Sequence, residues 1–267
     1  SFNAAISALA KGGQWMRALD LLDEMHKCRV EPDVISFNAA ISACEKGKEW
    51  NRALELLTEM QKHGVEPNVI SFNAAISACE KGGQWERALD LLDDMRTRGL
   101  EVNVISFNAA ISACEKGGQW ERALSLLDDM RRFGHEPDVI SYSSAITACG
   151  KKGKWEKALS ILDEMRRHGV QPNSISLSAA IEALEGCDQH ALSAMVYVRG
   201  LKKGLFTYWN DEVIGRASID LHGCSERLAR VVVRHAVREY TRGNAVPLKQ
   251  PQQTSHSDHR TGGDHDS

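Results

Sequence analysis

Two side chains near the C-terminus have the residue types and the spacing of an acid–base pair. Asp220 and His222 lie within the segment Ile219-Asp-Leu-His-Gly223. We expect a short strand over residues 219–222, which would point both side chains to one face. A carboxylate and an imidazole placed in this way could serve acid–base chemistry. They could equally hold a strand–helix turn by hydrogen bonds, because no nucleophile or metal ligand accompanies them.

Two further sets of polar residues recur along the chain at intervals of 35 residues. Each set of residues at the same position of successive units is called a column. The first column lies opposite the apolar stripe of a predicted helix and consists of Asn3, Asn38, Asn73, Asn108 and Ser143. An Asn amide has both a donor and an acceptor and could read the edge of a base, although an Asn can also satisfy free N–H groups where a helix starts. The second column follows a turn and consists of Asp33, Asn68, Asn103, Asp138 and Asn173. Its alternative interpretation is a turn residue, for which Asp and Asn are favoured.

These columns belong to a unit of 35 residues that is written several times. Tryptophan keeps this period at Trp15, Trp50, Trp85, Trp120 and Trp155. Four of the seven cysteines keep it too, at Cys44, Cys79, Cys114 and Cys149. A small, weakly polar residue that recurs once per unit indicates a packing position between helices rather than a metal or redox site.

Each unit has the pattern of a helical hairpin. In residues 69–103 the first apolar stripe has helical spacing and comprises Phe72, Ala75, Ile76 and Cys79. Ser71 is the expected N-cap, and Gly82–Gly83 ends the helix. A second stripe begins at Trp85 and ends near Gly99. One hairpin cannot bury its apolar face alone, so we predict an all-α fold, a right-handed superhelical α-solenoid.

Composition excludes several other classes of protein. The 267 residues are 42% hydrophobic and 26% charged, which excludes a wholly disordered chain and a small disulfide scaffold. No apolar run approaches the roughly 18 residues of a membrane span, so we expect no membrane association. The net charge of -3 provides no global electrostatic reason to bind nucleic acid.

The period, the segment Val69-Ile-Ser-Phe-Asn-Ala-Ala-Ile-Ser-Ala-Cys-Glu-Lys-Gly-Gly83 and the pattern Ala88-Leu-x-Leu-Leu-x-x-Met95 resemble pentatricopeptide repeats. The resemblance covers five repeats over residues 1–173, the first truncated at its start, and a degenerate capping repeat over 174–205. It implies binding of single-stranded RNA, one base per repeat, in RNA processing, stability or editing in a mitochondrion or plastid. A tetratricopeptide array has a period of 34 residues and a different Trp, Gly and Tyr pattern.

The resemblance also implies roles for four columns. The Asn/Ser column and the column after the turn would jointly select bases, with a preferred core of U-Y-Y-U-A read 5′ to 3′ (Y, pyrimidine). An apolar column resembles the residues that sandwich successive bases: Ile35, Ile70, Ile105, Ile140 and Ile175. A basic column resembles the lysines that contact phosphate: Lys11, Lys46, Lys81, Lys116 and Lys151. Local charge beside the RNA backbone would then outweigh the net charge.

The C-terminal part departs from the repeat. Over residues 206–243, the Asp220/His222 segment and the apolar helix after it resemble the opening of the small MutS-related domain, some members of which cut nucleic acid. The later glycine-rich motif is present only as Thr261-Gly262-Gly263-Asp264, so we expect a partial α/β segment. We expect a disordered tail over 244–267, whose His256, His259 and His265 could bind metal loosely. We predict no resident metal and no cofactor.

Three hypotheses follow from the sequence. The first is an RNA-binding adaptor, monomeric, with possible RNA-processing proteins as partners. The second is an RNA endonuclease that uses Asp220 and His222. The third is a protein-binding scaffold. Because Ser1 falls partway through a repeat, we also expect further sequence upstream.

Overall fold

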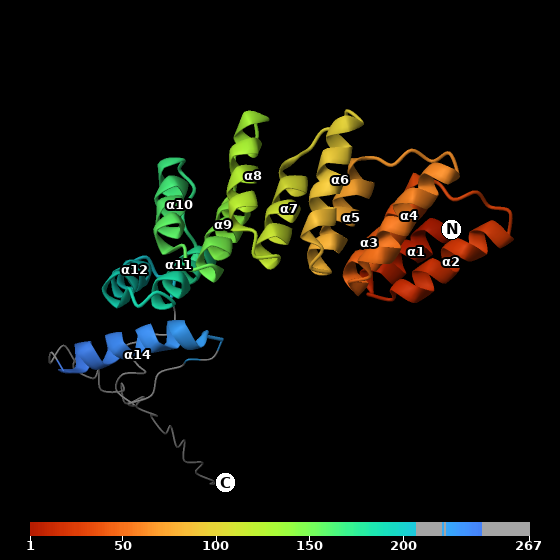
Figure 1. Ribbon diagram of the computed structural model, residues 1–267. Coiled ribbons are helices and arrows are strands. Elements are labelled where there is room, and N and C mark those ends of the chain that lie inside the picture. The colour runs from red at the N-terminus through yellow and green to blue at the C-terminus, as the bar shows by residue number, and fades with distance from the viewer. Residues whose placement is uncertain (207–220, 222, 242–267) are drawn as a thin grey trace, which may run out of the picture.

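The computed structural model describes residues 1–206, 221 and 223–241, and these form thirteen helices and no β-strand (Figure 1). The repeats contribute α1 (Phe2–Lys11), α2 (Trp15–Lys27), α3 (Val34–Gly47), α4 (Trp50–Lys62), α5 (Val69–Lys81), α6 (Trp85–Thr97), α7 (Val104–Lys116), α8 (Trp120–Arg132), α9 (Val139–Lys151) and α10 (Trp155–Arg167). Beyond them lie α11 (Ser174–Glu185), α12 (His190–Lys202) and α14 (Glu226–Thr241). The predicted all-α solenoid is confirmed.

The helices form two layers along an arch (Figure 1). Each of the helices α1, α3, α5, α7 and α9 packs on the next odd-numbered helix, so this layer is continuous from α1 to α11. The helices α2, α4, α6, α8 and α10 pack on the odd-numbered helices on either side, and no two of these five come within 8 Å between Cα atoms. The odd-numbered helices therefore line the inner side of the arch, and the even-numbered ones cover its outer side.

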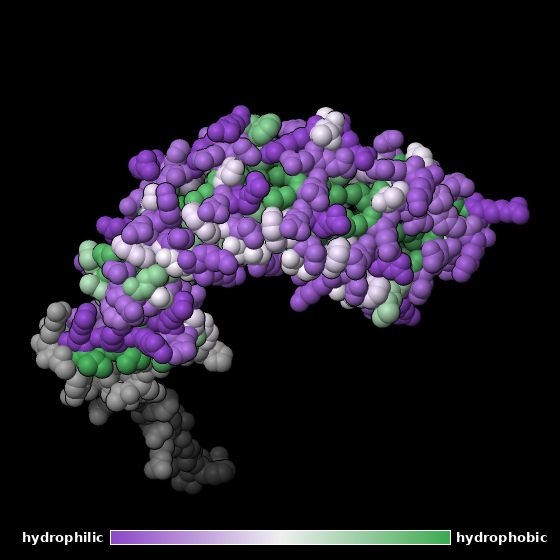
Figure 2. All heavy atoms as spheres, in the orientation of Figure 1, coloured by the Kyte–Doolittle hydropathy of each residue, from purple (hydrophilic) through white to green (hydrophobic). Residues whose placement is uncertain are grey.

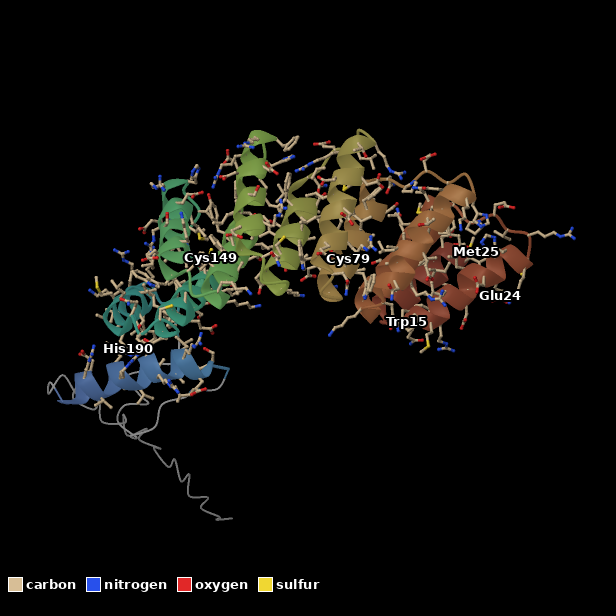
Figure 3. The ribbon with its side chains drawn as sticks, viewed as in Figure 1. Trp15, Glu24, Met25, Cys79, Cys149 and His190 are labelled. Atoms are coloured by element: carbon tan, nitrogen blue, oxygen red, sulfur yellow. The ribbon has the colours of Figure 1, made fainter. Side chains whose placement is uncertain are left out.

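The repeated apolar residues form the core as their spacing predicts. Phe72, Ile76 and Cys79 of α5 are fully buried, as is Met95 of α6. Figure 3 shows Cys79 and Cys149 within the helical layers. Burial raises the pKa of the Cys79 thiol to about 11, so it remains protonated at neutral pH. A buried neutral thiol fits the packing role predicted for this column.

The tryptophan column explains the glycines at the ends of α3, α5 and α7, because each of these glycines packs against the tryptophan of the preceding repeat. A Cβ atom on Gly82 would lie 2.3 Å from Cδ1 of Trp50, which belongs to the preceding repeat. Gly82 has an ordinary φ of -82°, so the requirement for glycine here is steric rather than conformational. At the next position, Gly83, the φ of +71° is left-handed, and glycine adopts it without strain.

Gly82→Ala should therefore destabilise the protein by about 1–3 kcal/mol, because the added methyl group forces Trp50 out of its packed position. Urea denaturation followed by circular dichroism measures the change. Gly12→Ala is the matched control: it lies at the same position of the first repeat, where a Cβ would come no closer than 3.5 Å to any atom. Equal destabilisation by both variants would show that the tryptophan contact is not the cause.

The end of the solenoid is closed by three helices. α14 packs against α11 and α12, and the Arg234 side chain forms an ion pair with Glu185, whose side chain is 3% exposed. The Ser193 hydroxyl also donates a hydrogen bond to Glu185. The predicted C-terminal helix is thus present, whereas Asp220 and His222 of the predicted strand lie outside the described residues, as does the 244–267 tail. None of the described helices is long and apolar enough to cross a membrane.

Candidate nucleic-acid interface

The Asp/Asn column that follows the turn forms the N-caps of the odd-numbered helices. In α5, Asn68 Oδ1 accepts hydrogen bonds from the backbone N–H of Ile70 (3.0 Å) and of Ser71 (3.1 Å). The Asn68 N–H donates in turn to Ser71 Oγ at 3.1 Å, which completes a capping box. The assignment of Ser71 as the N-cap was therefore wrong: Ser71 is the third helical residue, and the cap lies three residues earlier. The same box starts α3, α7, α9 and α11.

The structure brings the two columns that the sequence predicts to select bases together in pairs across successive repeats. Asn38 Nδ2 donates to Asn68 Oδ1 at 3.3 Å, and Asn3 Nδ2 lies 3.1 Å from Asp33 Oδ1. The same contact joins Asn73 to Asn103 (3.4 Å) and Asn108 to Asp138 (3.1 Å). Residues 30 positions apart thus form one polar pair at each junction between successive odd-numbered helices from α1 to α9.

A buried serine determines the orientation of each Asn amide. Ser71 Oγ donates to Asn38 Oδ1 at 2.5 Å. Because backbone N–H groups already donate to Asn68 Oδ1, Asn38 must turn its Nδ2 toward that oxygen and its own Oδ1 toward the serine. One N–H of Nδ2 is then left for a ligand. Equivalent bonds link Ser36 to Asn3, Ser106 to Asn73 and Ser141 to Asn108.

These serines were not among the candidate site residues. The signal that could have identified them is a serine repeated three positions after each Asp or Asn cap, which is the spacing of a capping box. Their complete burial shows why a serine suits this position, since its small hydroxyl joins two polar side chains inside the packed layer.

The fifth unit lacks this arrangement. Ser143 is 7% exposed, and its hydroxyl has no hydrogen-bond partner among the described residues. Ser176 Oγ instead donates to the backbone carbonyl of Asn173 at 3.0 Å. This unit therefore has a shorter side chain, Ser143, in the predicted base-selecting column, and the hydroxyl of that side chain is unsatisfied.

The isoleucine column is exposed in every repeat. Each residue lies two positions after an N-cap, and its exposed fraction is 57–63%: Ile35, Ile70, Ile105, Ile140 and Ile175. A single exposed Ile is ordinary, but one on each of five consecutive odd-numbered helices forms an apolar row beside the paired polar columns. Such a row suits flat apolar groups such as bases.

The lysine column lies at the other end of the same helices. Lys81 is the last residue of α5, eight residues after Asn73, which corresponds to about 12 Å along a helix. Its Nζ lies 2.7 Å from Glu45 Oε1 in the preceding repeat. Lys116 pairs likewise with Glu80 and Lys151 with Glu115, each at 2.5 Å. No ion pair joins Lys11 or Lys46 to any described residue, so the positive charge is least neutralised at the N-terminal end of the row.

The acidic members of the cap column are well suited to accept hydrogen bonds. The backbone N–H of Ser36, its hydroxyl, and the N–H of Ile35 lower the pKa of Asp33 below its usual value, against a smaller opposing effect of burial. Asp33 is therefore a carboxylate at neutral pH, with acceptor oxygens only. Asn68 at the equivalent position provides a donor as well.

Stacked helix pairs with one capped polar pair in each unit define a helical-repeat protein whose inner face presents the same groups at a regular interval. Family models match most of the chain: the pentatricopeptide repeat domain at residues 21–84, the PPR repeat family at 67–116, 102–151 and 139–185, and the PPR repeat at 1–30. The chain belongs to the pentatricopeptide repeat family. A comparison with curated proteins finds no match.

Solved structures show the same fold. The pentatricopeptide repeat protein PPR10 from maize is 25% identical, with a TM-score of 0.67 over 92% of this chain. This chain spans 35% of that protein. The same protein in complex with an 18-nt psaJ RNA element is 23% identical over 92% of this chain and 39% of that one, with a TM-score of 0.63. The PPR domain of Arabidopsis thaliana protein-only RNase P 1, in complex with tRNA, is 17% identical, with a TM-score of 0.59 over 69% of this chain and 100% of that domain.

Proposed function

We propose that the protein binds single-stranded RNA along the inner face of its odd-numbered helices, one base per repeat. The observation that supports this most strongly is the geometry of the paired columns. Each Asn lies within hydrogen-bond distance of the next repeat's cap, and an exposed Ile lies two residues beyond that cap. A base placed between two successive isoleucines would present its edge to the polar pair.

The proposed base preference is U-Y-Y-U-A. The family resemblance gives U for the first and fourth units, and the acceptor oxygens of an Asp at this position suit the N3–H group of uracil. Asn68 and Asn103 provide donor and acceptor, so the second and third units take C or U. In the fifth unit the short Ser143 leaves room for a purine, and we propose A.

The cellular role is an inference from the family. We propose that the RNA is an organellar transcript and that the protein acts in its processing, stability or editing. The likeness of residues 206–243 to the small MutS-related domain, and cleavage by Asp220 and His222, stay predictions, as do the domain bounds and the monomeric state.

RNA binding is tested by fluorescence anisotropy with a single-stranded oligonucleotide that contains UCUUA. Replacing Ile70, Ile105 and Ile140 with Ala should weaken binding roughly tenfold or more, because three bases lose their apolar support. The fold should be unaffected, since these side chains are about 60% exposed. Met16→Ala, which removes an equally exposed apolar side chain on α2, should leave binding unchanged. Binding that is absent at low salt, or indifferent to the triple substitution, would contradict the proposal.

A further inference from the structure

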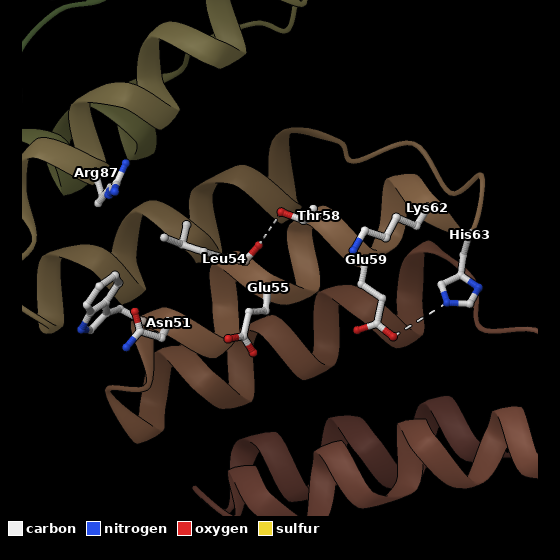
Figure 4. A pocket seen from close by; sticks show the side chains of 9 residues that line it. Asn51, Leu54, Glu55, Thr58, Glu59, Lys62, His63 and Arg87 are labelled. Atoms are coloured by element: carbon white, nitrogen blue, oxygen red, sulfur yellow. Dashed lines mark hydrogen bonds and ion pairs between the residues drawn. The ribbon is translucent and has the colours of Figure 1, made fainter.

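Three potential metal ligands meet where the first two repeats pack together on the outer side of the arch. His26 lies near the end of α2, while Glu59 and His63 lie at the end of α4. One ligand atom from each lies within 4.8 Å of the other two. The two imidazole rings are 4.7 Å apart between centroids. Figure 4 shows the contact between His63 and Glu59, in which His63 Nε2 is 3.8 Å from Glu59 Oε1.

The equivalent junctions further along the chain are built differently. Arg96 and Arg131 occupy the column of His26, and each forms an ion pair with a carboxylate of the next repeat, Asp129 and Glu164 respectively. At the first junction the arginine is replaced by an imidazole whose Nε2 is buried and has no hydrogen-bond partner among the described residues. A buried nitrogen left in this state destabilises the fold unless something binds it.

We propose that His26, Glu59 and His63 bind a divalent transition-metal ion, with Zn²⁺ as the most suitable. Two imidazoles and one carboxylate are a ligand set that zinc accepts at about 2.0–2.2 Å, with a fourth position left for water. Ligand atoms around a tetrahedral zinc ion lie about 3.4 Å apart. The ligand separations of up to 4.8 Å must therefore shrink by up to about 1.4 Å, and rotation of the exposed His63 side chain allows this. Coordination through Nε2 would give the buried His26 nitrogen the partner that it lacks.

The surroundings leave the site open to solvent and place both basic and acidic side chains near the ion. Glu59 and His63 line an open pocket of about 660 Å³ on the outer side of α4 (Figure 4). Lys62 and Arg87 also line it, and Glu55 partly offsets their charge. The visible face of the arch is mainly hydrophilic, with apolar atoms showing between helices (Figure 2).

The site joins residues that are 33 and 37 positions apart, so a bound ion would fasten the first repeat to the second. It lies on the even-numbered helices, away from the paired columns of the inner face. The inference therefore does not depend on the proposed RNA binding, and either can fail without the other.

Zinc binding is tested on the full chain by calorimetric titration with Zn²⁺ and by the visible absorption of Co²⁺. We expect one site, a higher melting temperature with Zn²⁺, and a loss of affinity of at least about 10- to 100-fold in His26→Gln and His63→Arg. Both replacements are the residues that the next repeat has in these columns, Gln61 and Arg98, so the fold should tolerate them.

Two control variants separate this site from other ligands. One replaces the tail residues His256, His259 and His265 with Ala, and the other is Cys28→Ser, which removes an exposed thiol next to α2. Both should keep the site. A site that persists in His26→Gln and His63→Arg, that disappears in either control, or that is absent from the parent chain would overturn the proposal.

Discussion

Ser143→Asn is expected to change the base preferred by the fifth unit from A to a pyrimidine. The new amide could accept the hydrogen bond of Ser176 and donate to Asn173, as Asn73 does with Ser106 and Asn103. The longer side chain would fill the space that a purine needs. By analogy with base-edge contacts in DNA, at about 1–3 kcal/mol each, the preference should shift by roughly 10- to 100-fold.

Selection from random RNA, followed by affinity measurements on five-base cores that differ in one position, provides the test. Asn73→Ser is the reciprocal variant: it should move the third position from pyrimidine toward A and leave the fifth unchanged. An unchanged fifth position in Ser143→Asn, or a change at every position, would refute the assignment of Ser143 and Asn173 to one base.

Replacing Glu45, Glu80 and Glu115 with Gln should strengthen RNA binding. Each of these carboxylates holds the lysine of the next repeat in an ion pair, which competes with phosphate. Their removal would free three lysines on one edge of the inner face. For single-stranded nucleic acid each added phosphate contact steepens the plot of log affinity against log salt by about 0.7, so the slope should steepen by about 2. Affinity at low salt should rise roughly tenfold or more.

A control with the same change in net charge tests whether the position of the removed carboxylates determines the gain in affinity. Asp93, Asp128 and Asp163 pair with arginines on the even-numbered helices, away from the paired columns. Their replacement with Asn also adds three units of positive charge but should change affinity much less. An equal gain in both triple variants would show that only net charge matters, and no gain in either would remove the lysine column from the interface.

Residues within one helix were predictable because their neighbours are set by helical spacing. The stripe from Phe72 to Cys79 and the end of the helix at Gly82 follow from the sequence alone. The start of that helix did not, since Asn68 and Ser71 are both good capping residues and a capping box uses both. The capping preferences of the two residues cannot decide which of them begins the helix, because in a capping box the side chain of each accepts a hydrogen bond from the backbone N–H of the other.

The 35-residue period by itself determined the all-helical solenoid and its buried columns, because helical spacing and the need to bury an apolar face leave few other solutions. The set of candidate RNA-binding residues came from the resemblance of the sequence to pentatricopeptide repeats. Only the tertiary structure decided which of those residues meet. It joined Asn38 to Asn68 across two repeats, oriented that amide through Ser71, and paired Lys81 with Glu45. It also brought His26 to Glu59 and His63. Contacts between residues 30–37 positions apart depend on how one hairpin packs on the next, and no rule of spacing within a single helix contains that information.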